Sequence, residues 1–178
     1  AAKDGILTFS LMDEAVPVLQ VSLRNRQSAE AFVDLLTYDS DVALTFRDPL
    51  PDEHARASEV GIALPGLAGG SVVLGGEALV PVVSPLNPVR TIDPADLISA
   101  FAGQITDWAE MGQPAMLLTL HLGSVGDGQA DAFLAMLPAP PAATLIRHPD
   151  PDALAQAVAA DPGALGIAAL SASGVAQP

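Results

Sequence analysis

Short apolar runs alternate with helix-forming segments along this chain, and proline or glycine marks most of the changes. After a first apolar stretch at 6–11, the pattern predicts strands at 16–23, 41–46, 72–74, 78–84, 115–122, 142–147 and 166–170. It predicts helices at 29–36, 52–59, 95–102, 129–136 and 152–160. Strands that alternate with helices are typical of an α/β fold, because each helix carries the chain back across the sheet.

Three local signals place residues within these elements. Asp93-Pro94 supplies a capping side chain and a proline at the start of the helix at 95–102, and Gly103 is expected to end it in a left-handed conformation. Ser28 is predicted as the N-cap of the helix at 29–36. Trp108, the single tryptophan, is expected to be buried against the helix at 95–102.

Charge and composition exclude several classes of function. The 21 acidic residues outnumber the 7 basic ones, and the formal net charge of −14 excludes binding to nucleic acid or docking on anionic lipid. The chain has no cysteine, so disulfides and thiol chemistry are excluded, and no apolar run reaches the ~18 residues of a membrane span. Because residue 1 is not methionine, we expect that any signal peptide has been removed.

No motif for catalysis or metal binding is present. The acidic groups at 52–54 and 150–152 lack the ligand spacing of a calcium loop, and three scattered histidines do not predict a zinc site. Ser124 misses the Gly-x-Ser-x-Gly pattern because position 122 is leucine, and His121 is interpreted as a half-buried strand residue. We therefore expect no enzyme, no cofactor and no metal.

Helix N-termini supply the remaining chemistry, since their free N–H groups attract oxyanions. A glycine-rich turn at 123–128 precedes the helix at 129, and Gln27-Ser28 precedes the helix at 29. Arg24, Arg26 and Arg47 lie near the second of these places. The pattern fits an anion site, and it also fits ordinary turns with surface arginines paired to acidic residues.

Three segments resemble the PstS-like phosphate-binding proteins of bacterial ABC importers. They are a proline-containing strand with an Asn-Pro connector at 79–89, a Phe-x-Gly-x-Ile-Thr-x-Trp stretch from Phe101 to Gly112, and an Asp-Pro-Gly-Ala-Leu-Gly strand entry at 161–167. The resemblance implies an α/β, two-lobed fold of the periplasmic type II kind with lobe one incomplete. Lobe one would take residues 1–78, lobe two 79–170, and 171–178 would form a loose tail or a return crossover.

The same resemblance implies a ligand-binding set. Gly126, Asp127, Gly128 and Gln129 fall on the family's Gly-Ser-Gly-Thr anion loop. Ser28 falls on the serine of an earlier turn and Arg47 on the family's arginine, and Ser124 and Arg24 complete the predicted set. The implied function is non-enzymatic binding of a small oxyanion, phosphate by family, between the lobes of a periplasmic protein that serves a membrane transporter.

Three departures favour a rival interpretation. Asp127 replaces the serine donor, Gln129 replaces threonine, and Gly123 replaces an arginine. A carboxylate at a helix N-terminus caps that helix and takes the place of an external anion. The rival is an envelope interaction or scaffold module that keeps the fold without the ligand, similar to the PstS-like domains of OmpA-family envelope proteins. A third interpretation is the effector domain of a transcription regulator, although no helix-turn-helix accompanies it.

Overall fold

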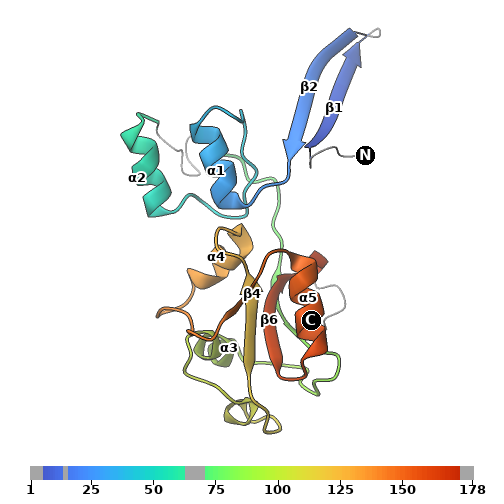
Figure 1. Cartoon of the computed structure of the whole chain (residues 1–178), viewed down its shortest axis with the longest axis vertical. Coiled ribbons are helices and arrows are strands. Elements are labelled where there is room, and N and C mark those ends of the chain that lie inside the picture. The colour runs from blue at the N-terminus through green and yellow to red at the C-terminus, as the bar shows by residue number, and fades with distance from the viewer. Residues whose placement is uncertain (1–5, 14–15, 63–70, 173–178) are drawn as a thin grey trace.

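A computed structural model describes residues 6–13, 16–62 and 71–172 of the chain. The first two strands, β1 (Ile6–Asp13) and β2 (Val16–Arg24), form an antiparallel hairpin that projects away from the rest of the molecule (Figure 1). Both apolar stretches predicted at this end of the chain are therefore strands. Their only neighbours in the two-stranded sheet are each other.

Two helices follow the hairpin, α1 (Ser28–Leu36) and α2 (Pro51–Glu59), and both were predicted. With the irregular segment between them they form the first unit. The strands predicted at 41–46 and 72–74 are wrong, since both segments are irregular. A strand needs a neighbour to complete its hydrogen bonds, and the hairpin that precedes α1 extends away from these segments (Figure 1). Ser28 is also not the N-cap: Gln27 holds that position, and Ser28 is the first helical residue.

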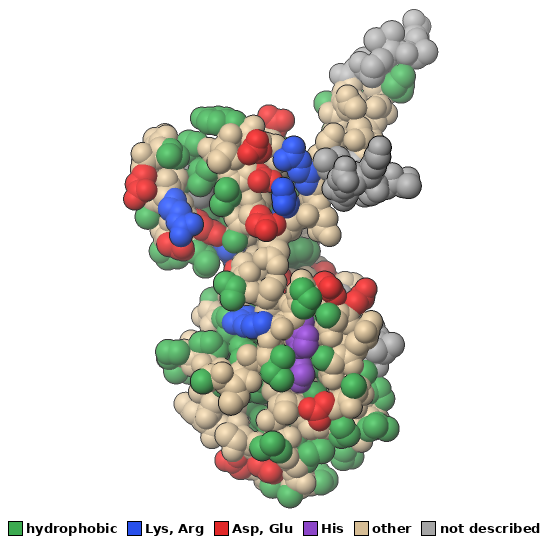
Figure 2. All heavy atoms as spheres, in the orientation of Figure 1, with side chains coloured by type: hydrophobic (Ala, Val, Ile, Leu, Met, Phe, Trp, Pro, Cys, Tyr) green, Lys and Arg blue, Asp and Glu red, His purple; other side chains and the backbone are tan. Residues whose placement is uncertain are grey.

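The remaining elements form a second unit around a four-stranded sheet with the order β3-β6-β4-β5. In chain order they are β3 (Leu79–Val83), α3 (Pro94–Phe101), the 3-10 helix η1 (Trp108–Met111), β4 (Thr119–Gly123), α4 (Gly128–Leu134), β5 (Ile146–His148), α5 (Pro151–Ala160), β6 (Ala164–Ala169) and the 3-10 helix η2 (Leu170–Ala172). Strand β4 runs parallel to β5 and β6, whereas β3 pairs antiparallel with β6. The two units meet over a narrow waist (Figure 2).

The second unit has three layers, because β6 buries both of its faces. On one face Leu165 and Ile167 join a cluster with Phe101 of α3, Trp108 and Phe133 of α4. On the other face the small residues Ala164 and Ala168 let α5 pack closely, through a cluster that includes Leu154 and Val158. Both clusters lie at or after residue 79, so we propose residues 79–170 as one folding unit. Most of the expected tail, 173–178, lies outside the described residues.

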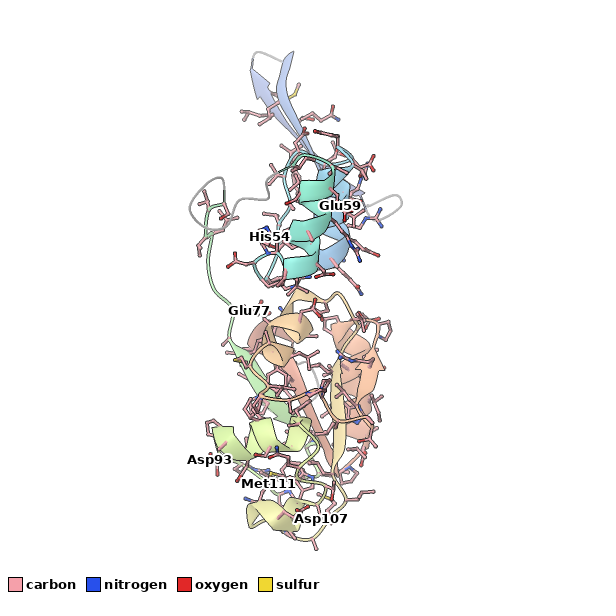
Figure 3. The ribbon with its side chains drawn as sticks, turned by 90° about the vertical axis from the view of Figure 1, so that its left-hand side faces the viewer. His54, Glu59, Glu77, Asp93, Asp107 and Met111 are labelled. Carbon is pink, nitrogen blue, oxygen red and sulfur yellow. The ribbon has the colours of Figure 1, made fainter. Side chains whose placement is uncertain are left out.

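The second unit confirms the local signals. The Asp93 side chain accepts a hydrogen bond from the Ala95 N–H at the start of α3, and Gly103 has φ +76°. Asp107 caps η1 in the same way, and both aspartates lie at the end of the second unit that is remote from α2 (Figure 3). Trp108 is buried in the cluster that contains Phe101, and its indole N–H donates to the Gly163 carbonyl at 3.0 Å.

Segment 84–89 is fixed by buried polar side chains. Asn87 donates through Nδ2 to the Pro162 carbonyl at 2.8 Å and accepts from the Val89 N–H through Oδ1 at 2.9 Å. Ser84 donates to the Ala159 carbonyl at 2.9 Å. These bonds tie the connector after β3 to the turn between α5 and β6.

No helix of the described residues is long and apolar enough to cross a membrane.

A pair of histidines lies on the adjacent strands β4 and β5. His121 Nδ1 and His148 Nε2 are 2.9 Å apart, and the rings are stacked with centroids 5.1 Å apart. His121 is buried, and its Nε2 has no hydrogen-bond partner among the described residues. Burial lowers the pKa of both histidines, and the neighbouring His148 lowers that of His121 further, while Asp161 opposes the shift for His121 and Asp150 for His148.

The histidine pair predicts a loss of stability in mild acid. Because both pKa values are lower in the folded state than in the unfolded chain, the folded protein binds fewer protons than the unfolded chain once the pH falls below about 6.5. The free energy of unfolding should therefore decrease from about pH 6.5 down to the folded pKa values. His121→Val should flatten that dependence in urea titrations between pH 5 and 7.5. His54→Gln is the matched control and should keep it; equal slopes for all three proteins would contradict the assignment.

Candidate functional site

The predicted anion site lies where β4 and β5 end and the two units meet. Ligands of open α/β sheets bind beyond the carboxyl ends of the strands. Here β4 leads through residues 124–127 into α4, and β5 leads through 149–150 into α5. The N-terminus of α1 in the first unit contacts the loop before α4, since the Ala29 N–H donates to the Gly126 carbonyl at 3.2 Å.

Both helix N-termini at this edge are capped by carboxylates. Asp127 Oδ1 accepts from the Gln129 N–H at 2.9 Å, and Asp150 Oδ1 accepts from the Ala153 N–H at 2.7 Å. A cavity lined by both aspartates, by Gly123 and by Gln129 has a volume of about 20 Å³. A volume of that size holds about one water molecule. At both helix N-termini a carboxylate of the chain itself therefore accepts a backbone N–H.

Gly123 and Asp127 depend on each other. A Cβ atom at position 123 would collide with the Asp127 carboxylate, so no larger residue fits at 123 in this arrangement. Gly123 and the position of the Asp127 carboxylate are therefore sterically coupled. Arg147 of β5, which the sequence analysis did not single out, also lies at this edge, and its Nη1 donates to the Gly123 carbonyl at 2.9 Å. Burial lowers the pKa of Arg147, against the attraction of Asp131 and Asp127.

Glycines let the loop before α4 approach α1 closely. A Cβ at Gly128 would collide with the Ser28 side chain, and Gly126, at φ +88°, would bring a Cβ within 3.1 Å of Gln27 Oε1. Gln27 also donates through Nε2 to Ser124 Oγ at 2.5 Å. The Ser28 hydroxyl accepts the Phe46 N–H at 3.4 Å. Four of the predicted residues thus form the contact between the units.

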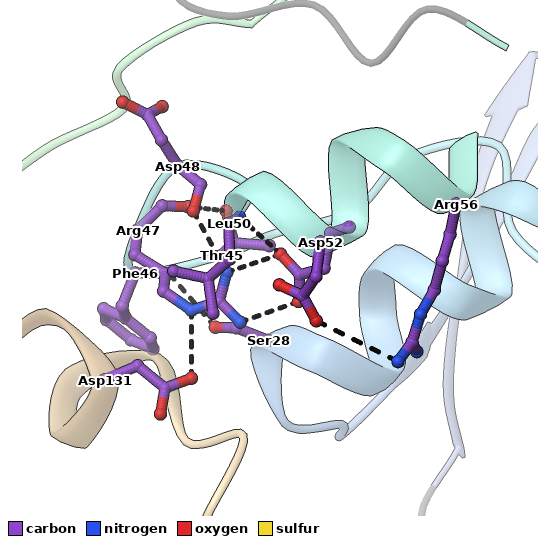
Figure 4. A network of polar contacts seen from close by, with 10 residues as sticks. Ser28, Thr45, Phe46, Arg47, Asp48, Leu50, Asp52, Arg56 and Asp131 are labelled. Carbon is purple, nitrogen blue, oxygen red and sulfur yellow. Dashed lines mark hydrogen bonds and ion pairs between the residues drawn. The ribbon is translucent and has the colours of Figure 1, made fainter. Parts of the chain in front are cut away.

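Arg47 joins the two units through a buried ion-pair network (Figure 4). Its side chain is 6% exposed, and its Nη1 and Nη2 donate to the two Glu53 carboxylate oxygens of α2 at 2.7 and 2.8 Å. Its Nε donates to Asp131 of α4 at 3.1 Å, and its guanidinium lies 5.4 Å from the centre of the Phe32 ring. The positive charge of Arg47 is therefore neutralised by ion pairs with two carboxylates of the same chain.

The network shifts the ionisation of both partners. The hydrogen bonds that Arg47 donates to Glu53 raise the pKa of Arg47 despite its burial, and the charges of Glu53 and Asp131 raise it further. Burial alone would raise the pKa of Glu53, but the bonds from Arg47 and from the Leu50 N–H outweigh it, and the pKa lies below its ordinary value. Both groups are charged at neutral pH.

The structure brings together seven of the eight predicted site residues: Ser28, Arg47, Ser124, Gly126, Asp127, Gly128 and Gln129. Arg24 lies apart, at the end of β2 opposite Ile6, and its side chain makes no ion pair or hydrogen bond with another described residue. The predicted set left out four participants, Gln27, Glu53, Asp131 and Arg147, of which Gln27 was named only as the residue before Ser28. For Arg147 a signal exists, because it lies near the carboxyl end of a predicted strand.

The described residues offer little for a metal or a cofactor. No group of three or more histidine, aspartate or glutamate side chains among them is arranged to hold a metal ion. A larger groove of about 440 Å³ lies beside α1 and is lined by Phe32, Arg47 and Gly126. The site's chemistry is therefore that of hydrogen bonding and charge.

The model of the family described as the PBP superfamily domain matches residues 1–177, and the chain belongs to this family. No curated protein sequence matches the chain. Among solved structures, the chain is similar to a protein from Clostridium perfringens described as a phosphate ABC transporter substrate-binding protein, solved with bound phosphate. The TM-score is 0.68 and the identity 17%, over 82% of this chain and 56% of that one.

Two further structures show the same fold. The ABC-type phosphate transport receptor of Vibrio cholerae gives a TM-score of 0.61 at 19% identity, over 82% of this chain and 57% of the other. PstS of Borrelia burgdorferi gives a TM-score of 0.53 at 16% identity, over 78% of this chain and 54% of the other. The chain thus spans little more than half the length of these proteins. The expected α/β fold of the phosphate-binding proteins is confirmed, and the proteins matched are substrate-binding proteins rather than enzymes.

The Arg47 network predicts a large difference between two arginines. Arg47→Met leaves Glu53 and Asp131 buried without a counter-charge, so the free energy of unfolding should fall by about 3–5 kcal/mol. Arg56→Met, at the exposed pair with Asp52 (3.9 Å), should change it by less than about 1 kcal/mol. Chemical denaturation of both variants at pH 7 measures the difference; a similar small change for both would show that Arg47 does not hold the units together.

Proposed function

We propose that this chain is a non-enzymatic interaction module that keeps the solute-binding fold and fills the anion seat with its own groups. The observation that carries the proposal is the Asp127 carboxylate, which caps α4 where an external oxyanion would bind. An oxyanion needs free donors and room for its oxygens. The cavity beside Asp127 holds about one water molecule, and a tetrahedral oxyanion has four oxygens.

Two further donors at the junction are occupied as well. The Ala29 N–H of α1 donates to Gly126, and the Arg47 guanidinium donates to Glu53 and Asp131. An incoming anion would have to displace these partners and to approach Asp127 and Asp150 against their charges. Displacement of a partner from a buried charge is costly, which supports the interaction module over the transporter's binding protein.

Binding of a small, phosphate-like oxyanion is the second candidate function. It is favoured by the convergence of Ser28, Arg47 and the loop before α4 on one junction. The phosphate-transport proteins with the same fold support it too. In that case Arg47 would exchange at least one carboxylate for the ligand, and a membrane transporter would be the partner.

We place either function in the periplasm or the cell envelope. The proposal rests on the family and on the resemblance of the motifs at 79–112 to PstS-like domains. For the interaction module the partner is another envelope component, and an association with an OmpA-type domain belongs to this proposal.

Asp127→Ser tests the self-filled seat. It removes one negative charge and restores a hydroxyl, so the affinity for phosphate at pH 7 should rise about tenfold or more. Serine is also a good N-cap, so the free energy of unfolding should fall by no more than about 1 kcal/mol. Calorimetry with phosphate, sulfate and molybdate compares the variant with the wild type, which should give no heat or only weak binding.

Asp93→Ser is the matched control, because Asp93 caps α3 in the same geometry at the remote end of the second unit (Figure 3). It should leave anion affinity unchanged. Tight phosphate binding by the wild type that Asp127→Ser weakens would reject the self-filled seat and establish the oxyanion-binding function.

A further inference from the structure

The β1–β2 hairpin is amphipathic from one strand to the other. Directly opposed pairs Phe9–Val21 and Leu11–Leu19 alternate with the polar pairs Thr8–Ser22 and Ser10–Gln20. Successive residues of a strand point to opposite faces of a sheet. One face therefore carries the apolar set Phe9, Leu11, Leu19, Val21 and Leu23, and the other carries hydroxyls and an amide, including a Thr8–Ser22 hydrogen bond of 3.4 Å.

Nothing among the described residues covers the apolar face. Its five side chains are between 40% and 62% exposed, and neither core cluster includes a hairpin residue. The hairpin extends away from both units (Figure 1). A two-stranded sheet is at best marginally stable in water, and it gains stability when its apolar face is packed against another surface. The face therefore needs an occupant.

Charge decides which occupant fits. Asp13 and Arg24 are the only charged residues within the two strands, so the hairpin is formally neutral, whereas the whole chain carries −14. Two copies of the chain repel each other over most of their acidic surfaces, but the neutral hairpins do not repel each other. Because the hairpin projects from the body, contact through it also keeps the acidic bodies of two copies apart.

We propose that two copies of this chain associate by stacking the apolar faces of their hairpins about a two-fold axis. An apolar face of this kind can pack against a copy of itself, as a two-fold interface requires. Phe9 and Val21 lie near the middle of the face, where the axis would pass, and the polar faces remain in water.

The size of the face sets the strength of the association. Eight residues at ~3.4 Å each and two strands ~4.8 Å apart give a face of about 27 by 10 Å. Two such faces cover about 540 Å², less than the ~1,200 Å² of a stable complex. The association should therefore be weak and concentration-dependent, and it should strengthen with salt because the bodies repel.

Phe9→Lys and Ser10→Lys test the proposal, because they add the same charge at neighbouring positions on opposite faces. In sedimentation equilibrium from 5 to about 500 μM, the mass of the wild type and of Ser10→Lys should rise toward two chains. Phe9→Lys should remain a single chain, and its dissociation constant should rise about tenfold or more. Trp108 fluorescence checks that the second unit stays folded.

A cross-linking experiment covers the case in which Phe9→Lys unfolds the hairpin. Since the chain has no cysteine, Val21→Cys should form a disulfide between copies under oxidation, and Ser22→Cys on the polar face should not. A wild type that stays a single chain at the highest concentration would overturn the proposal. So would equal cross-linking of both variants, or association that Phe9→Lys leaves unchanged.

Discussion

The buried guanidinium of Arg47 is the interaction that holds the first unit against the second. It connects an irregular segment of the first unit with α2 through Glu53 and with α4 through Asp131. A buried charge is tolerated only where its partners and hydrogen bonds offset the loss of water, and here two carboxylates meet three guanidinium nitrogens. Ser28 lies against Gly128 and Ala29 against Gly126 at the same junction.

The motifs that carry the family resemblance are structural. Trp108 and Asn87 bond to the carbonyls of Gly163 and Pro162, so two of the recognised segments pin the third. Gly103 and Gly112 take the left-handed conformation that glycine favours. These residues maintain the second unit whether or not a ligand binds. The resemblance is therefore strong evidence for the fold and weak evidence for the binding of a ligand.

The elements of the second unit could be predicted because their signals are local. Asp93-Pro94 and Gly103 mark the ends of α3 without reference to the rest of the chain. The segment 41–46 has the alternation of a strand but finds no partner strand, and pattern alone does not reveal that. Ser28 is used by a contact with Phe46 rather than as a cap.

The site was harder to predict because its partners come from distant parts of the chain. Arg47 and Asp131 are 84 residues apart in sequence, and only the packing of α4 against the first unit brings them together. Likewise, the clash between a side chain at Gly123 and Asp127 follows from the turn at the end of β4. Sequence spacing identified the junction but not the pairing within it.

The charges at the junction bear on the function of the whole chain. Arg47 is paired with two carboxylates, Glu53 and Asp131, and Asp127 and Asp150 add carboxylates at the N-termini of α4 and α5. An anion site normally concentrates positive potential against the charge of the protein around it. This junction has the same sign as the chain of −14 in which it lies. Its arrangement therefore favours a closed contact between two units over a receptor for a free anion.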